Sequence, residues 1–220
     1  LDDRLSKWFP RIAKSRKITV AMLLNMTSGI ADFVNGNFTW LTKAQRKDPR
    51  RIWTPGRMIR GAMRMPRAFA VPGSQFAYSN TNTIILGRIL EKVRGVAYGE
   101  LLQRRILDPL GMSRSFIDMS GDLWDPHAQT YSNLYGEIHG SPRTLRVTNW
   151  SLSTGWAAGG LASTLWDMKV WAKALGTGEG VLQGRTQRRR TSDCVVQGTG
   201  ADYTQEYCLG MAIYREISSG

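Results

Sequence analysis

The sequence predicts an α+β fold in which helices dominate and only a small part of a sheet is present. Most segments with a clear pattern are helical, with apolar residues three and four apart and capping residues at their starts. Only the segment from Tyr207 to Ile217 has the apolar and aromatic character of a strand. A hydrophobic content of 42%, with 10% aromatic residues, indicates a chain that folds around a core.

The first third of the chain is expected to hold three short helices. Leu1 to Pro10 is predicted to be a helix that ends at proline. Ile18 to Met26 is predicted to be the second, with Thr19 as its N-cap and the turn 27–29 after it. The third begins at Thr54, because a capping residue followed by proline is typical of a helix start.

The clearest helix runs from Thr81 to Arg94, with Ser79 as the expected cap and Gly95 as its end. One face of it carries the apolar residues Ile84, Ile85, Ile89, Leu90 and Val93. Another short helix is predicted from Tyr98 to Leu107, where Asp108-Pro109 stops it.

The second half of the chain is predicted to be less regular. Residues 118–155 are rich in loop-forming residues, and 157–161 are small residues that allow backbones to approach closely. Thr164 and Asp167 form a capping box, which predicts a helix that continues to about Leu175.

The chain is strongly basic, with 30 Lys and Arg against 17 Asp and Glu and a net charge of +13. Residues 43–67 hold nine basic side chains and one acid, Asp48, and Arg57, Arg60 and Arg64 share a helix face. Codon bias in a GC-rich genome is the simpler explanation, and attraction to a polyanion is the alternative. Nucleic-acid binding is disfavoured, because no recognisable fold or interleaved surface aromatics accompany the charge.

Two cysteines, Cys194 and Cys208, flank a polar segment that contains glycine. A hairpin there would bring them within disulfide reach, and two free buried thiols are the alternative. With His127 and His139 they show no metal-ligand spacing, so no metal site is expected.

The most informative residues are Tyr78-Ser79-Asn80, at the start of the clearest helix and shortly after the turn Pro72-Gly73. A tyrosine and an asparagine two residues apart at a helix start can point into one cleft. Tyr78 is therefore a candidate for proton transfer, and Asn80 is a candidate for holding a carbonyl or amide group of a substrate.

Four blocks in this order resemble one protein family: Leu23 to Ile30, Pro72 to Asn80, Asp108 to Met112, and Gly159 to Met168. The family is that of the serine β-lactamases and penicillin-binding proteins, in its branch of class C β-lactamases and D-alanyl-D-alanine carboxypeptidases. Some esterases and D-aminopeptidases share the pattern. The resemblance covers nearly the whole chain.

The fold that this resemblance implies is a β-lactamase/transpeptidase-like one, in which an α/β sandwich with a central sheet adjoins a mostly helical lobe. Residues 1–220 would be part of one such domain. About 20–155 would form the helical lobe, and 156–220 would return to the sheet lobe. The N- and C-terminal parts of the domain would be missing, so this chain would be mainly the helical lobe with an incomplete sheet.

The mechanism implied is acyl transfer without a cofactor. A serine in a Ser-x-x-Lys motif attacks an amide, β-lactam or ester carbonyl, and the lysine and a tyrosine shuttle its proton. Tyr78 matches that tyrosine, and Asn80 matches the asparagine that binds the substrate. Because a free tyrosine has a pKa near ~10, it needs a cationic neighbour to act as a base.

The chain departs from the family pattern in lacking Ser-x-x-Lys and the Lys- or His-x-Gly strand that closes the cleft. Both motifs would fall beyond the ends of this chain, so it is interpreted as an internal fragment that is inactive by itself. A non-catalytic binding or regulatory member of the same fold is the alternative. Ser28 is expected to be structural, and a second Tyr-Ser-Asn at 131–133 is expected to be a loop coincidence.

The resemblance also implies substrates and a location. D-alanyl peptides, β-lactams or esters are the expected substrates, with a carboxypeptidase-like or broad hydrolase favoured over a dedicated β-lactamase. Such enzymes work outside the cytoplasmic membrane, in the periplasm, secreted or anchored to the membrane. An anionic cell-wall or membrane surface would suit the basic chain, in which no signal peptide is visible.

Overall fold

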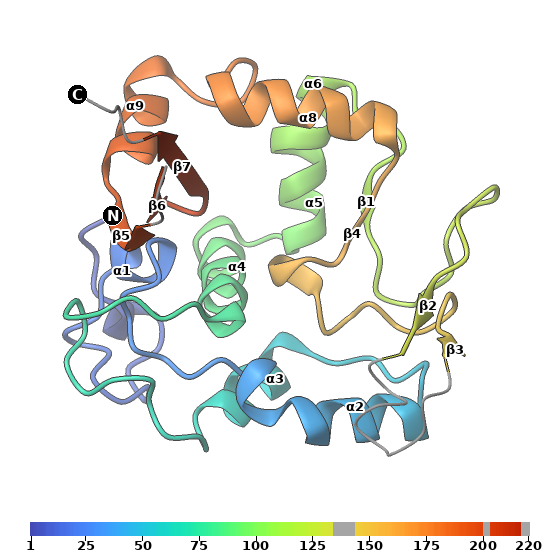
Figure 1. Ribbon diagram of the computed structural model, residues 1–220, viewed down its shortest axis with the longest axis horizontal. Helices are drawn as coiled ribbons and strands as arrows, with labels where there is room; N and C mark the ends of the chain where they lie inside the picture. The colour runs from blue at the N-terminus through green and yellow to red at the C-terminus, as the bar shows by residue number, and fades with distance from the viewer. Residues whose placement is uncertain (134–143, 200–202, 217–220) are drawn as a thin grey trace.

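The computed structural model describes residues 1–133, 144–199 and 203–216. Helices form most of its regular structure (Figure 1). The helical elements in chain order are η1 (Leu5–Lys7), α1 (Val20–Leu24), η2 (Asn35–Asn37), α2 (Phe38–Lys47), α3 (Pro55–Ala62), α4 (Asn80–Arg94), α5 (Tyr98–Leu102), η3 (Gln103–Leu107), α6 (Asp108–Leu110), η4 (Trp156–Ala158), α8 (Leu165–Thr177) and α9 (Gly184–Ser192).

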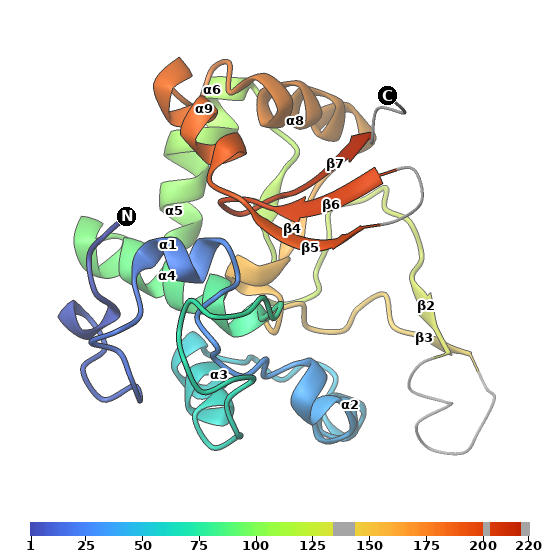
Figure 2. The ribbon, with the colours of Figure 1, turned by 60° about the vertical axis from the view of Figure 1, so that its left-hand side comes forward.

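The strands are short and antiparallel, and they form three separate sheets. β1 (Phe116–Ile117) pairs with β4 (Leu161–Ala162), and β2 (Tyr131–Ser132) pairs with β3 (Leu145–Arg146). The third sheet has the order β5-β6-β7, formed by Val195–Thr199, Tyr203–Tyr207 and Ala212–Glu216. Its strands lie side by side below α8 and α9 (Figure 2).

Three of the predicted helix caps are confirmed. The hydroxyl oxygens of Thr19, Thr54 and Thr164 each accept a hydrogen bond from the backbone N–H three residues later, at 3.2, 3.4 and 3.2 Å. These bonds satisfy N–H groups that a helix start leaves without an intrahelical partner. Threonine at these positions therefore sets where α1, α3 and α8 begin.

Ser79 was expected to cap α4 in the same way, and this prediction is wrong. Ser79 occupies the N-cap position, but its side chain makes no capping bond. Its hydroxyl instead donates to the backbone carbonyl of Ala31, at 3.2 Å. The reason is tertiary, because the strand-like segment before α4 packs against residues 26–33 and leaves Ser79 fully buried.

Other sequence predictions placed element ends wrongly. Leu1 to Pro10 contains only the single turn η1. The helix from Tyr98 does not stop at Asp108-Pro109 but widens into a π-helix and continues to Gly111, whose φ is +66°. Proline is tolerated there because it falls in the first turn of α6.

The strand predicted from Tyr207 to Ile217 is two strands, because the chain reverses between β6 and β7. Ile217 itself lies outside the described residues. The helices α2 and α9 were not predicted. The sequence of α9 is polar and basic throughout, and the described apolar side chains of α2, Trp40, Leu41 and Ala44, span little more than one turn, which is too short for a clear helical stripe.

The core is built around α4, which lies near the middle of the molecule (Figure 1). Ile84 and Ile85 are fully buried in one cluster with Leu23 of α1 and Ile59 of α3. Gly87 allows α4 to approach η4, because a Cβ there would lie 2.8 Å from the ring of Trp156. This packing fixes the position of the α4 N-terminus, where the candidate site lies.

Candidate functional site at the start of α4

The segment that leads into α4 is joined to the turn after α1 by backbone hydrogen bonds. Gly73 N–H donates to the carbonyl of Thr27 at 2.8 Å, and Ala77 N–H donates to that of Met26 at 3.0 Å. Two chain segments about fifty residues apart in sequence thus lie side by side. These backbone hydrogen bonds hold Tyr78 and Asn80 next to the turn after α1.

Side chains complete this junction. Thr81 donates to the carbonyl of Ala31 at 2.7 Å and accepts from Phe33 N–H at 3.1 Å. Ser28 is buried, donates to Asn82 Oδ1 at 2.8 Å and accepts from Ile30 N–H at 3.0 Å. The structural role expected for Ser28 is confirmed by these contacts.

Tyr78 and Asn80 lie next to each other, and both are near Asp32. The Tyr78 hydroxyl is 3.5 Å from Asn80 Oδ1. Asn80 Nδ2 donates to both carboxylate oxygens of Asp32, at 3.2 and 3.0 Å. The carboxylate also accepts from Val34 N–H at 3.0 Å and from Asn35 Nδ2 at 2.6 Å.

Tyr207, at the end of β6, forms an aromatic wall beside this group. Its ring lies edge-on to that of Tyr78, with centroids 6.1 Å apart, and 5.6 Å from that of Phe76. The C-terminal sheet therefore contributes a residue to the site. Sequence reasoning found neither Asp32 nor Tyr207, because only the folded chain brings them to Tyr78.

The pKa values of both tyrosines are raised. For Tyr78 the larger cause is partial burial, and the negative charge of Asp32 adds to it. Burial and then the neighbouring Tyr78 raise the pKa of Tyr207 to about 12. With these neighbours alone, Tyr78 is a neutral hydroxyl at physiological pH, which can donate a proton but is a poor base.

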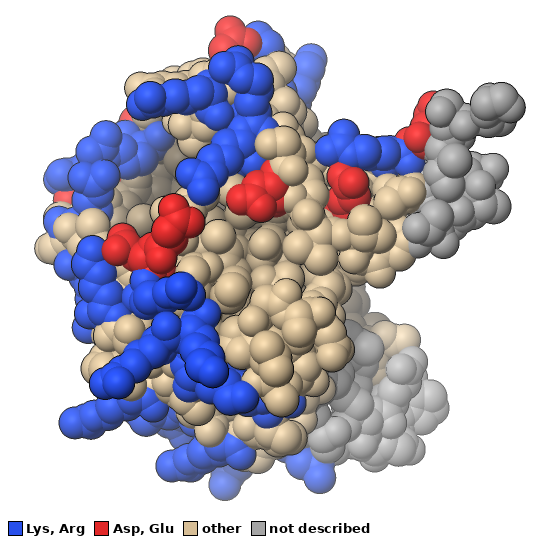
Figure 3. Space-filling model, turned by 90° about the vertical axis from the view of Figure 1, so that its left-hand side faces the viewer, with Lys and Arg blue, Asp and Glu red and all other residues tan. Residues whose placement is uncertain are grey.

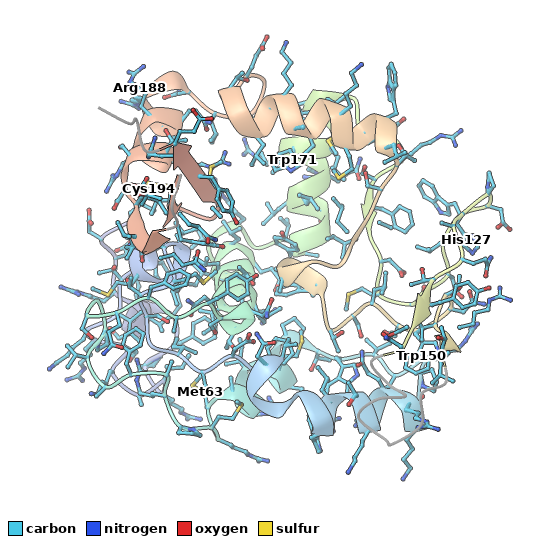
Figure 4. All side chains as sticks on the ribbon, in the orientation of Figure 1. Met63, His127, Trp150, Trp171, Arg188 and Cys194 are labelled. Carbon is cyan, nitrogen blue, oxygen red and sulfur yellow. A yellow bond between two sulfur atoms is a disulfide. The ribbon has the colours of Figure 1, made fainter. Side chains whose placement is uncertain are left out.

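Cys194 and Cys208 are joined in a disulfide. Cys194 lies between α9 and β5 (Figure 4), and Cys208 directly follows Tyr207. The bond therefore ties the start of β5 to the end of β6 beside the aromatic wall. Among the described residues, these sulfurs and the carboxylate of Glu206 form the one three-member cluster of metal-type ligands, and the disulfide occupies both sulfurs.

The second Tyr-Ser-Asn sequence lies elsewhere in the fold. Tyr131 and Ser132 form β2, which pairs with Arg146 and Leu145 of β3. The expected loop is therefore a short strand, and Tyr131 is exposed there.

The basic residues are widely distributed over the surface. Figure 3 shows Lys and Arg around much of one face, with acidic groups and uncharged surface between them. In the described part of the chain, no helix is both long and apolar enough to span a membrane.

Comparison with known proteins identifies the class to which this fold belongs. Residues 1–218 match the family model described as Beta-lactamase. A D-stereospecific amidohydrolase from Streptomyces superposes with a TM-score of 0.83 at 27% identity, over 96% of this chain and 63% of the other. The fold is thus β-lactamase/transpeptidase-like, with helices and an incomplete sheet, as the sequence predicted.

Two curated relatives agree with that class. Penicillin-binding protein 4* of Bacillus subtilis is 26% identical over 155 residues, which is 68% of this chain and 33% of that protein. A D-aminopeptidase of Brucella anthropi is 30% identical over 126 residues, 57% of this chain and 23% of that protein. The chain belongs to the Beta-lactamase family, and it spans about a quarter to a third of the length of these relatives.

Proposed function

We propose that this chain is the central part of a serine hydrolase that acts through an acyl-enzyme, with Tyr78 as its proton-transfer residue and Asn80 as a substrate-binding residue. The observation that supports this most is the contact between the Tyr78 hydroxyl and Asn80 Oδ1, 3.5 Å apart at the start of α4. Membership of the Beta-lactamase family supplies the class of reaction.

The nucleophilic serine and its lysine belong, in this proposal, to a part of the protein beyond these 220 residues. The raised pKa of Tyr78 is consistent with that arrangement. A lysine ammonium placed beside Tyr78 would oppose the effect of Asp32 and favour the phenolate, which makes the tyrosine a competent base. The 220-residue chain by itself is inactive.

We place the substrate among small amides and peptides rather than β-lactams. The relatives include proteins named D-aminopeptidase and D-stereospecific amidohydrolase, and both names describe hydrolysis of bonds in D-configured compounds. A D-alanyl peptide, an amide or an ester fits the same chemistry. A location outside the cytoplasmic membrane, at the cell wall, accords with the disulfide between Cys194 and Cys208.

The test begins with the coding DNA upstream of Leu1, where the proposal expects an in-frame Ser-x-x-Lys within roughly thirty to forty codons. The full-length protein should then form a covalent adduct with a penicillin or a D-amino acid ester, visible as a mass increase on the peptide that holds this serine. A frame that opens at Leu1, or a motif without serine, would instead support a non-catalytic binding protein.

A further inference from the structure

A cavity of about 330 Å³ lies beside the strand pair β1–β4. Phe116 and Ala162, which are partners in that pair, line one part of it, and residues 123–128 line another. His127 places the cavity at the right edge of the molecule (Figure 4), whereas the sheet β5-β6-β7 lies at the left (Figure 1). The open edges of that sheet are thus on the other side of the molecule from this cavity. The cavity has no lining residue in common with the group around Tyr78.

Trp124 gives the cavity an aromatic surface. Its ring stacks on that of Phe116, with centroids 4.4 Å apart and planes inclined by 27°. Phe116 covers one face of the indole, and Trp124 is nevertheless 60% exposed, so the opposite face is available to a ligand. An indole offers a large apolar face on which a ring-shaped ligand can stack.

Hydrogen bonds hold the loop that leads to Trp124. The backbone N–H of Asp118 donates to the carbonyl of Gly160 at 2.9 Å, which extends the pairing of β1 with β4. The buried carboxylate of Asp118 accepts from the N–H groups of Ser120 at 2.9 Å and Gly121 at 2.8 Å. The aromatic surface is therefore formed before a ligand arrives, which lowers the entropic cost of binding.

Ser163, at the end of β4, contributes a hydrogen-bond acceptor to the cavity. The hydroxyl of Ser115 donates to Asp167 Oδ2 at 2.7 Å, and the oxygens of Ser115 and Ser163 are 2.6 Å apart. Because the proton of Ser115 is directed to Asp167, Ser163 is the donor between the two serines. A hydroxyl oxygen has two lone pairs, so Ser163 can still accept from a ligand.

The two fully charged side chains that line the cavity, Arg114 and Asp125, have opposite signs and are both exposed. Arg114 makes no ion pair with any residue that the structure describes. Asp125 Oδ1 lies 3.0 Å from His127 Nδ1, and the Asp125 side chain is 93% exposed. An anionic ligand would meet Asp125 and a cationic one would meet Arg114. A neutral hydroxyl suits both, since it accepts from a guanidinium and donates to a carboxylate.

From these observations we infer that the cavity binds a neutral pyranose sugar. The apolar C–H face of the sugar ring lies on Trp124, and its hydroxyls bond to Arg114, Asp125 and Ser163. A planar aromatic ligand would stack as well, but it would leave these polar groups without partners, which weakens binding. The volume is at the lower end of the roughly 300–1,000 Å³ of small-molecule sites, which suits one or two sugar rings. The inference does not depend on the reaction proposed at Tyr78.

The first test is saturation-transfer NMR on the full-length protein with cellobiose, maltose and N,N′-diacetylchitobiose. At least one of these disaccharides should bind saturably, with the strongest transfer to the C–H protons of one ring face. Trp124→Ala should weaken its binding roughly tenfold or more, because the stacking surface is lost. Arg114→Met, which keeps the length of the side chain but removes its donors, should weaken it about three- to tenfold.

The matched control is Trp166→Ala, which removes an exposed tryptophan of α8 that does not line this cavity. It should leave the affinity unchanged. Binding of none of the three sugars, or equal loss in the Trp166 and Trp124 variants, would overturn the inference. Should Trp124→Ala fail to fold, unchanged affinity in Arg114→Met would count against it as well. The tetrasaccharide of the sugar that binds best separates two sources: a unit within a polysaccharide gives equal or tighter binding, and a free sugar binds only as the disaccharide.

The second test asks whether the ligand is a neutral sugar. Its affinity should be the same at about 50 and about 500 mM NaCl, whereas an anion held by Arg114 would bind more weakly at high salt. N-acetyl-L-phenylalaninamide, a neutral aromatic compound, should bind more weakly than the sugar. Tighter binding of this compound would make the cavity a site for aromatic side chains and contradict the inference.

Hydrolysis rates keep this inference separate from the proposed function. Trp124→Ala should hydrolyse D-alanine amide at the wild-type rate, because Trp124 has no contact with the group around Tyr78 in the described structure. If the full-length protein binds the sugar but cleaves no amide or ester, the sugar site stands and the hydrolase proposal fails. If it cleaves D-alanine amide but binds no sugar, the hydrolase stands and the sugar site is wrong.

Discussion

At the scale of single residues, the chemistry of the site depends on a tyrosine hydroxyl held beside an amide. Tyr78 is almost half exposed, at 45%, and its edge contact with Tyr207 involves the ring rather than the hydroxyl. Within the described residues, the hydroxyl makes one long hydrogen bond, to Asn80 Oδ1. Removing it should therefore affect proton transfer far more than stability.

We predict that Tyr78→Phe in the full-length protein lowers the rate of acylation by roughly a hundredfold or more, since general acid–base groups contribute ~10²–10⁴. The thermal unfolding midpoint should change little. The matched control is Tyr131→Phe, in the second Tyr-Ser-Asn, which should keep the wild-type rate. An unchanged rate in Tyr78→Phe would remove Tyr78 from the mechanism.

Sequence reasoning reached Tyr78 and Asn80 because both lie in a short motif with a recognisable turn before it and a helix after it. It did not reach Asp32, which lies 48 residues from Asn80 and touches it only when residues 26–33 pack against the start of α4. Tyr207 was assigned to a strand, but its contact with Tyr78 depends on where the C-terminal sheet lies. Contacts of this range leave no local pattern.

At the scale of elements, close approach between α4 and η4 defines the core. Gly87 is the residue that permits it, because a Cβ there would lie 2.8 Å from Cβ of Ala157 and from the Trp156 ring. Trp156 is buried, so it has little freedom to move aside. A glycine in the middle of a helix is otherwise unfavourable, which indicates that packing outweighs helix propensity here.

We predict that Gly87→Ala destabilises the full-length protein by about 1–3 kcal/mol through overpacking, despite the higher helix propensity of alanine. Gly61→Ala in α3 is the control, because nothing lies within 4 Å of a Cβ at that position. It should stabilise the protein by up to ~1 kcal/mol. Urea unfolding of the two variants checks the opposite signs, and equal changes would contradict the packing argument.

The sequence predicted α1, α3, α4 and α8 well, since caps and apolar stripes are local signals. It failed for α9, which is polar throughout, and for α2, whose described apolar side chains span little more than one turn. It also ended the helix that begins at Tyr98 too early, at Leu107. The chain from Tyr98 to Gly111 stays helical, through a π-helix at Gln103–Leu107 and with Pro109 in the first turn of α6, where its missing N–H is tolerated.

At the scale of the whole molecule, the three-stranded sheet is open on both sides in the described structure, since β5 and β7 each have one strand neighbour. Large apolar side chains are exposed, among them Val196 and Tyr214 of that sheet and Leu165 and Trp166 of α8. Open strand edges and exposed apolar surface favour association with further protein segments.

We therefore predict that the isolated 220-residue chain is poorly stable and prone to associate. Differential scanning calorimetry should give a broad transition at low temperature, with light scattering that rises with concentration. The full-length protein should unfold cooperatively. A sharp, high-temperature transition of the isolated chain as a monomer would contradict this prediction.

Alkaline pH should weaken the attachment of the C-terminal sheet. Tyr207 has a pKa of about 12 in the folded protein against about 10 for an unperturbed tyrosine. The folded state thus holds this proton more tightly. Its contribution to stability is complete below pH 10 and is lost as the pH rises through 12.

We predict that Tyr207→Phe reduces the loss of stability between pH 10 and 12, measured by urea unfolding at several pH values. A residual slope should remain, because the pKa values of Tyr78 and Tyr98 are raised as well. Tyr131→Phe, at an exposed position, should behave like the wild-type protein. A slope in Tyr207→Phe equal to that of the wild type would contradict the pKa assignment.

Backbone hydrogen bonds join Met26 to Ala77, Thr27 to Gly73 and Gly29 to Ala68. They close residues 30–67 into a long excursion whose two ends meet at the start of α4. Loop-closure entropy grows only with the logarithm of length, so doubling such an excursion costs about 0.6 kcal/mol. An insertion at the exposed residues Lys47 and Asp48, ahead of Pro49 whose carbonyl accepts from Ser151 N–H, should therefore leave Tyr78, Asn80 and Asp32 in their positions.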